Sequence, residues 1–262
     1  MRDGRLYYEI AGETHPLVLL HGGLVDSGLW DPQFPAFAQH YRMVRYDLRG
    51  YGKSTPTTQS YSHVEDLHAL FTHLEIERTH LLGLSMSGTI AIDFTLSYPE
   101  AVSALLHVAG GLSGYQPTSY TEDEERIFAA EEAALDRGDL AEAVETYLRL
   151  WTVGPNRTPD QVDPAVIERV REMTAQLYGR GEELPSRKLD PPAVSRLSEI
   201  SAPTLIVHDD QDVSHIAEVA NVLAAGIPGA RKVIIPDTAH HLNLEKPEEF
   251  NRIVLGFLQR VR

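Results

Sequence analysis

One stretch of ten residues constrains the fold of this chain more than any other. Residues 79–84 form an apolar run, Ser85 follows directly, and apolar side chains then recur at helical spacing. This pattern predicts a buried strand that turns sharply into a helix at Ser85, an arrangement called a nucleophile elbow. Such a corner strains the backbone at the serine and requires small neighbours. Gly83, Ser87 and Gly88 meet that requirement, with Ser87 standing where the usual motif has a second glycine.

Apolar runs separated by helix-length segments recur along the chain. Residues 5–10 alternate between apolar and polar side chains, which predicts a half-buried strand at a sheet edge. Short runs, most of them rich in apolar residues, predict strands at residues 17–20, 42–46, 79–84, 102–108, 203–207 and 232–235. Strands with such spacing pair in parallel through right-handed crossovers, and helices cover both faces of the sheet. We therefore expect an α/β fold with a mostly parallel, doubly wound sheet.

This rhythm stops in the middle of the chain. Residues 115–196 contain several helical patterns and no convincing strand. We predict that residues 1–114 and 197–262 form the core and that residues 115–196 form an inserted helical cap. Thr121 and Glu124 predict a capping box at the start of one cap helix.

Composition and charge argue against several classes of function. The 262 residues include no cysteine, which excludes disulfides, thiolate zinc sites and a cysteine nucleophile. The formal net charge of −15 argues against a nucleic-acid partner, because phosphate binding relies on a basic surface. No apolar run approaches the ~20 residues of a membrane span, and residues 1–12 carry no apolar signal region. We expect a cytoplasmic protein that binds no membrane, and the sequence predicts no particular oligomeric state.

The ends of the predicted strands carry the groups that an acyl-transferring serine requires. These groups are a base, an acid that orients it, and N–H donors for the developing oxyanion. In an open parallel sheet they should collect at the carboxyl ends of the strands. His240 and His241 follow the last predicted strand, and either could reach Ser85. Residues 109–112 carry no acid, so the acid should come from the loop after residues 203–207, which holds Asp209, Asp210 and Asp212.

The first apolar strand ends in His21-Gly22-Gly23. Glycines at this point let backbone N–H groups approach a substrate oxygen closely. We assign the oxyanion hole to the N–H groups of Gly23 and Met86, the second of which lies at the start of the elbow helix.

These motifs together resemble the α/β-hydrolase superfamily, over nearly the whole chain apart from the predicted cap. The matching segments are residues 21–23, Asp47-x-Arg49-Gly50-x-Gly52-x-Ser54, residues 83–88, Asp212, and His240 followed by Glu245-Lys246-Pro247. In relatives the catalytic histidine lies five residues before that glutamate, so the resemblance selects His240 over His241. The acid lies a few residues past the strand end, which selects Asp212 over Asp209 and Asp210. The start of the elbow motif, residues 83–86, is similar to 3-oxoadipate enol-lactonases and their small-ester relatives.

The resemblance implies a cofactor-free serine hydrolase acting on a small carboxylic ester or lactone. Ser85 would attack the carbonyl, His240 would carry the proton, and Asp212 would hold the imidazole tautomer. Two alternatives stay open: a carbon–carbon bond hydrolase, perhydrolase or hydroxynitrile lyase of the same fold, or a ligand-sensing module. Specificity should lie in the cap and the catalytic loops. The candidates for substrate binding are Leu24, Trp30, Trp151 and Val213.

Two other patterns suggest ligand sites that we do not expect. Residues 50–55 resemble the end of a phosphate-binding loop, but the glycine required five residues before Gly52 is replaced by Asp47. We expect a buried network of Asp47 and Arg49 to brace that loop instead. Histidines spaced by five on one helix turn ~140° from one to the next, so they cannot share a metal. These histidines are His63, His68 and His73.

Overall fold

The computed structural model describes residues 5–118, 120–180 and 186–261. Among these residues, seven strands form one sheet in the order β1-β3-β2-β4-β5-β6-β7. The strands are β1 (Tyr8–Ala11), β2 (Pro16–Leu20), β3 (Arg42–Tyr46), β4 (Thr79–Leu84), β5 (Val102–Val108), β6 (Thr204–Asp209) and β7 (Arg231–Ile235). The edge strand β1 pairs antiparallel with β3, and the other pairs are parallel. The predicted α/β fold with a mostly parallel sheet is confirmed.

The largest differences between the predicted and the observed strand ends have identifiable reasons. The edge strand starts at Tyr8 rather than at residue 5, because Arg5 and Tyr7 donate their backbone N–H groups to side chains of Thr55 and Ser54. Strand β6 continues past Val207 to Asp209, since its last residues still pair with β7.

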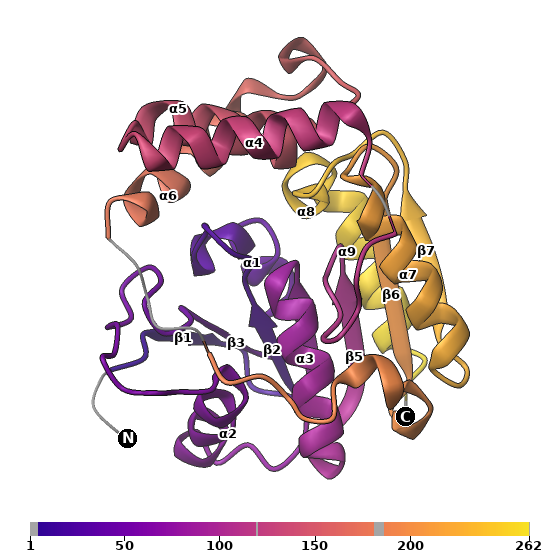
Figure 1. Cartoon of the computed structure of the whole chain (residues 1–262). Coiled ribbons are helices and arrows are strands. Elements are labelled where there is room, and N and C mark those ends of the chain that lie inside the picture. Colours follow the sequence, from indigo (N-terminus) through magenta and orange to yellow (C-terminus); the bar gives the residue numbers. More distant parts are fainter. Residues whose placement is uncertain (1–4, 119, 181–185, 262) are drawn as a thin grey trace.

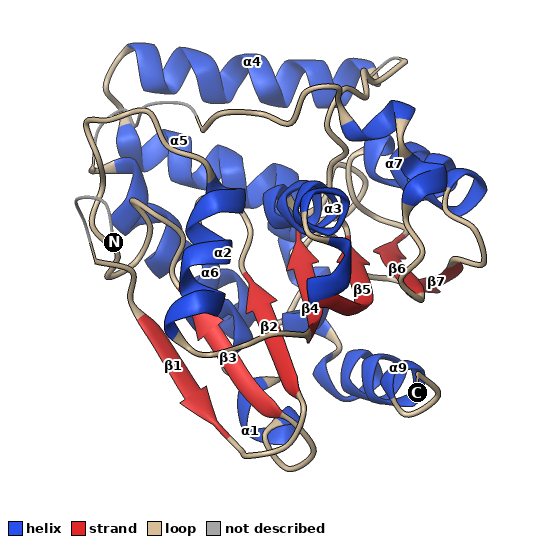
Figure 2. Cartoon of the chain, turned by 90° about the horizontal axis from the view of Figure 1, so that it is seen from below, coloured by secondary structure: helices blue, strands red, loops and turns tan. Residues whose placement is uncertain are grey.

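Helices cover both faces of the sheet. The structure has α1 (Phe34–Phe37), α2 (His63–His73), α3 (Met86–Ser97), α4 (Glu122–Asp136), α5 (Leu140–Tyr147), α6 (Pro164–Tyr178), α7 (Ser214–Gly226), α8 (Leu242–Glu245) and α9 (Pro247–Leu258). Figure 2 shows α1 and α9 on one face and α2, α3 and α7 on the other. Each face has its own apolar core, so every central strand is buried on both sides. The four-residue helix α8 was not predicted.

The segment between β5 and β6 adds no strand among its described residues. It folds mainly into α4, α5 and α6, which lie together above the sheet (Figure 1). The predicted capping box is confirmed at the start of α4, where Thr121 and Glu124 bond reciprocally at 2.7 and 3.2 Å. Residues 119 and 181–185 of the predicted cap lie outside the described residues. No helix in the described ranges has both the length and the apolar character needed to cross a bilayer.

Candidate active site

Ser85 occupies a sharp corner between β4 and α3. Its backbone has φ 59° and ψ −123°, a left-handed conformation that costs ~1–3 kcal/mol outside glycine. Three backbone hydrogen bonds hold it: the Ser85 N–H donates to the Val108 carbonyl at 2.9 Å, and the Ser85 carbonyl accepts from the N–H groups of Gly88 at 2.8 Å and Gly111 at 3.3 Å. A Cβ on Gly83 would lie 2.1 Å from the Ser87 carbonyl oxygen. Glycine at position 83 is therefore a steric requirement of the turn.

The two residues that end the motif are constrained differently. A Cβ on Gly88 would lie 2.8 Å from the His107 ring and 2.9 Å from the Gly110 Cα, so no larger residue fits. Ser87 is buried, and its hydroxyl donates to the His21 carbonyl at 2.5 Å. This bond gives the serine a partner that a glycine would lack. It also ties the first turn of α3 to the loop after β2.

Three side chains from different strand ends meet at this corner. The Nε2 atom of His240 lies 2.6 Å from the Ser85 hydroxyl, and its Nδ1 atom lies 2.5 Å from a carboxylate oxygen of Asp212. The other Asp212 oxygen accepts the Val213 backbone N–H at 2.7 Å. His240 and Asp212 are buried, whereas Ser85 is partly exposed. The two groups behind Ser85 are therefore shielded from water.

The alternative base and acids take other positions. His241 is buried, and its Nδ1 atom lies 3.2 Å from the Thr152 hydroxyl rather than near Ser85. Asp209 is the last residue of β6 and is buried. Asp210 is exposed and accepts the backbone N–H of Asp237 at 2.7 Å. Of the two histidines, His240 is the one that contacts Ser85, and of the three aspartates, Asp212 is the one that contacts His240. Asp209 lies behind this pair and interacts with the Asp212 carboxylate.

Burial sets the charge preferences of the pair behind Ser85. It lowers the pKa of His240 to about 3 and raises the pKa of Asp212 well above its ordinary value. Both shifts have the same cause: a charged group is less stable when it is buried away from water. The imidazole is therefore neutral near pH 7, the state in which a histidine can accept a proton.

A buried ion pair supports the loop that carries His240. Arg157 contacts Glu245 at 2.8 Å and also donates to the carbonyl of Asp237 at 3.1 Å. Glu245 in turn accepts the backbone N–H of Ala239 at 2.7 Å. Glu245 belongs to the matched motif, but nothing in the sequence pattern pointed to Arg157. The pair connects the segment before α6 to the residues on both sides of His240.

The residues predicted to form the oxyanion hole are neighbours in space. A Cβ on Gly22 would lie 3.1 Å from the Ser85 Cβ, and one on Gly23 would lie 4.0 Å from the Met86 Cβ. The carbonyl of Gly23 accepts the Tyr147 hydroxyl at 3.2 Å. The loop after β2 is thus held beside the start of α3.

The four predicted substrate-binding residues separate into two groups. Trp30 is fully buried and packs on Phe250 with ring centroids 6.2 Å apart, so it belongs to the core and cannot contact a substrate. Val213 is 1% exposed, and its backbone N–H donates to the Asp212 carboxylate. Leu24 is half-buried, and its carbonyl accepts the Thr174 hydroxyl at 3.0 Å. Trp151 lies closest to the chemistry, with its ring 4.6 Å from that of His240.

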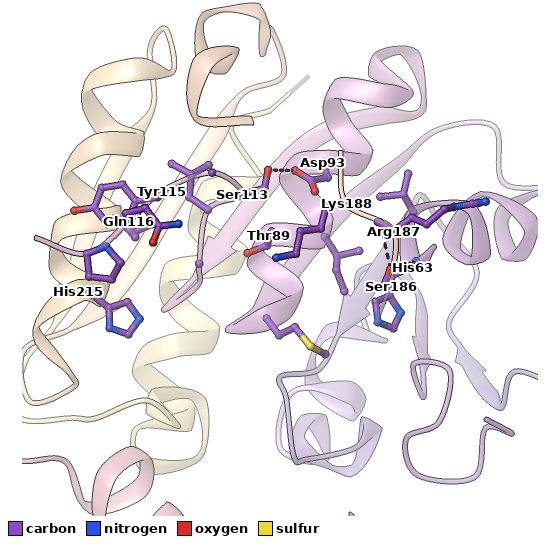
Figure 3. A pocket seen from close by; sticks show the side chains of 18 of the residues that line it. His63, Thr89, Asp93, Ser113, Tyr115, Gln116, Ser186, Arg187, Lys188 and His215 are labelled. Carbon is purple, nitrogen blue, oxygen red and sulfur yellow. Dashed lines mark hydrogen bonds between the residues drawn. The ribbon is translucent and has the colours of Figure 1, made fainter. Parts of the chain in front are cut away.

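A pocket of about 650 Å³ opens beside Met86, the residue that follows Ser85 (Figure 3). It lies between α3, the loop after β5, the start of α7 and residues 186–188. Its polar lining includes Thr89, Asp93, Lys188 and His215. None of the four predicted substrate-binding residues lines it. The α3 lining could have been found, because Thr89 and Asp93 lie one turn apart on the helix that the elbow starts.

The loop after β3 is braced differently from the expectation. Asp47 accepts the backbone N–H groups of Ser27 and Lys53 at 2.8 and 2.7 Å, while Arg49 pairs with Asp66 at 2.7 Å. A Cβ on Gly52 would lie 2.2 Å from the Asp47 carboxylate, so this acidic side chain packs directly against the glycine. Within the described residues, no group of three or more potential ligands is arranged to hold a metal ion.

Comparisons with known proteins agree with this architecture. A family model described as the alpha/beta hydrolase fold matches residues 15–247. A putative carbamate hydrolase, RutD, of Rhizobium rhizogenes is 30% identical over 264 residues, covering 97% of this chain and 98% of the relative. A 2-hydroxy-6-oxononadienedioate/2-hydroxy-6-oxononatrienedioate hydrolase of Cupriavidus pinatubonensis is 31% identical over 256 residues, covering 92% and 86%.

A solved structure shows the same similarity in three dimensions. Est816, described as an N-acyl homoserine lactone degrading enzyme, superposes with a TM-score of 0.78 at 25% identity, covering 98% of each chain.

Proposed function

The chain belongs to the α/β-hydrolase family, and we propose that it is a serine hydrolase that cleaves a small carboxylic ester or lactone. The observation that carries the proposal is the chain of contacts from Ser85 through His240 to Asp212, at 2.6 and 2.5 Å. The likeness to a lactone-degrading enzyme supports the choice of substrate class.

The proposed mechanism has two halves. Ser85 attacks the carbonyl carbon while His240 takes the hydroxyl proton and then delivers it to the leaving oxygen. Asp212 accepts the Nδ1–H of His240 and so keeps Nε2 free to act as the base. A water molecule, activated by the same histidine, then hydrolyses the acyl-enzyme and releases the acid.

The developing oxyanion needs donors on the side opposite the base. We assign this role to the backbone N–H groups of Gly23 and Met86, since the two residues lie side by side next to Ser85. One donor of this kind is typically worth ~3–4 kcal/mol of transition-state stabilisation. The positive end of the α3 dipole adds to it.

We further propose that residues 115–196 act as a cap over this site. Two contacts support the role: the Tyr147 hydroxyl bonds to the Gly23 carbonyl, and the Trp151 carbonyl accepts the His240 backbone N–H at 3.1 Å. The cap would thereby help to shape the acyl site and to exclude water from the base.

The proposal is tested with a panel of p-nitrophenyl esters and lactones of graded acyl size. The wild type should turn over at least one ester, and Ser85→Ala should lower kcat by up to ~10⁶. A fluorophosphonate probe should label the wild type and leave Ser85→Ala unlabelled. Retention of a tenth of wild-type turnover by Ser85→Ala would rule out the mechanism.

Carbon–carbon bond hydrolysis is a second candidate, favoured by the 31% identical hydrolase of 2-hydroxy-6-oxononadienedioate. The same serine and histidine would then act on a ketone flanking the bond that breaks. Spectrophotometric assays on a 2-hydroxy-6-oxodienoate and on the ester panel separate the two. A kcat/KM for the dienoate well above that of every ester would favour the second candidate.

A further inference from the structure

The pocket beside Met86 starts at the proposed chemistry. Met86 follows Ser85 directly. The ring of His215, another lining residue, has its centroid 6.2 Å from that of the Trp151 ring. Trp151 in turn contacts His240. One end of the pocket is therefore formed by the residue after Ser85 and by a ring that Trp151 separates from His240, and the rest extends along α3. An acyl chain attached to Ser85 could extend into this space.

Lys188 supplies a cation to the pocket. Figure 3 shows its amino group directed toward Thr89 on α3, whereas the guanidinium of Arg187 points away from Thr89. Within the described part of the chain, no hydrogen bond or ion pair engages the Lys188 side chain. Its segment is nevertheless anchored, because Arg187 donates its backbone N–H to the Tyr61 carbonyl at 2.8 Å and Ser186 accepts that of His63 at 3.1 Å.

None of the other ionisable lining groups that the structure describes forms an ion pair with Lys188. Burial lowers the pKa of His63 to about 4 and also lowers that of His215, so both rings are neutral at pH 7. Asp93 is buried and accepts the Ser113 hydroxyl at 2.7 Å, and burial raises its pKa. No ion pair within 4.0 Å is found between Asp93 and Lys188 among the described side chains.

We propose, on the basis of the proposed function, that this pocket selects acyl groups with an anionic end, whose carboxylate binds to Lys188 and Thr89. Such a site would offset the repulsion between this acidic protein and an anionic substrate. The net charge of −15 repels anions in general, so a substrate carboxylate needs a local cation beside the reacting bond. A hydrogen-bonded ion pair in a partly desolvated pocket provides it.

The test compares two series of activated esters on the intact protein. One series contains mono-p-nitrophenyl esters of dicarboxylic acids with four to eight carbons, and the other contains neutral acyl esters of matched length. We expect the wild type to prefer the anionic ester at one or more lengths by about tenfold in kcat/KM, the size of one charge-assisted hydrogen bond. The preference should fall as the salt concentration rises.

Variants then assign the preference to one side chain. Lys188→Gln should abolish the tenfold preference, mainly through KM for the anionic esters, and Lys188→Arg should restore most of it. Lys232→Gln, which removes an exposed lysine on β7, controls for the change in net charge and should keep the preference.

Two results would overturn the inference: no anionic preference at any length, or an equal loss on both series in Lys188→Gln, as expected if Lys188 only neutralises Asp93. Failure of the proposed function is recognised separately. In that case neutral esters would show no hydrolysis that depends on Ser85.

Discussion

Arg157 and Glu245 form a buried ion pair between the segment after Trp151 and the loop that carries His240. The two side chains are 6% and 7% exposed, so neither charge can turn to water if its partner is lost. Both also bond to the backbone of the His240 loop, at Asp237 and Ala239. The pair therefore links the stability of the fold to the position of the base.

Glu245→Gln should impair stability and turnover together. The change leaves the Arg157 charge buried without its counterion, which typically costs ~3–5 kcal/mol. Displacement of His240 by a fraction of an ångström should lower kcat by about 10–100-fold. Thermal unfolding and steady-state kinetics measure the two effects. Glu142→Gln is the matched control, because Glu142 pairs with Arg137 at the surface, where such a pair is worth ~0–1 kcal/mol.

Replacement of the two adjacent histidines should give opposite results. His240→Ala removes the base within 2.6 Å of the Ser85 hydroxyl and should lower kcat by several orders of magnitude, by ~10⁴-fold or more. His241→Ala removes a ring that contacts Thr152 and should retain most of the turnover while lowering the unfolding temperature. An inactive His241→Ala beside an active His240→Ala would reverse the assignment of the base.

Ser87→Ala should separate stability from chemistry in the elbow. The change leaves the buried His21 carbonyl without its hydroxyl donor and should cost ~1 kcal/mol or somewhat more. Turnover per folded molecule should stay close to that of the wild type, because Ser87 does not contact His240. Denaturant unfolding and active-site titration with a fluorophosphonate provide the two readouts. A collapse of turnover at full probe labelling would show that Ser87 takes part in the reaction.

The acid limb of the pH profile should lie below the usual histidine range. In the proposed mechanism protonation of His240 stops the reaction, and an ordinary histidine is half protonated near pH 6.5, at about its reference pKa. Burial lowers the pKa of His240, so kcat/KM should stay level as the pH falls through that range and decline only at lower pH. Circular dichroism at each pH distinguishes this decline from unfolding. An acid limb at or above the usual value would mean that Asp212 stabilises an imidazolium.

Continuous apolar runs made most of the sheet predictable from the sequence. Residues 42–46, 79–84 and 102–108 are strands with the predicted bounds, because helices cover both faces of the sheet and most side chains of its inner strands are therefore buried. The first strand was predicted to start too early, since its first residues pair with the loop after β3 and not with a strand.

The site residues that a local sequence pattern defines could be predicted, and those that depend on distant contacts could not. Ser85 and the small residues around it could be recognised because the turn itself imposes them. Trp30 was misplaced because its burial is decided by Phe250, far along the chain. Lys188 and Arg157 give no local signal, since their roles depend on what the fold places opposite them.

The backbone bond between His240 and the Trp151 carbonyl bears on how molecules enter and leave. An outward movement of residues 148–153 would break this hydrogen bond and displace His240 at the same time. Substrate entry along α3 avoids this conflict, because the pocket beside Met86 opens to solvent and neither His240 nor Trp151 lines it. Product release by the same route would leave His240 in position for the next catalytic cycle.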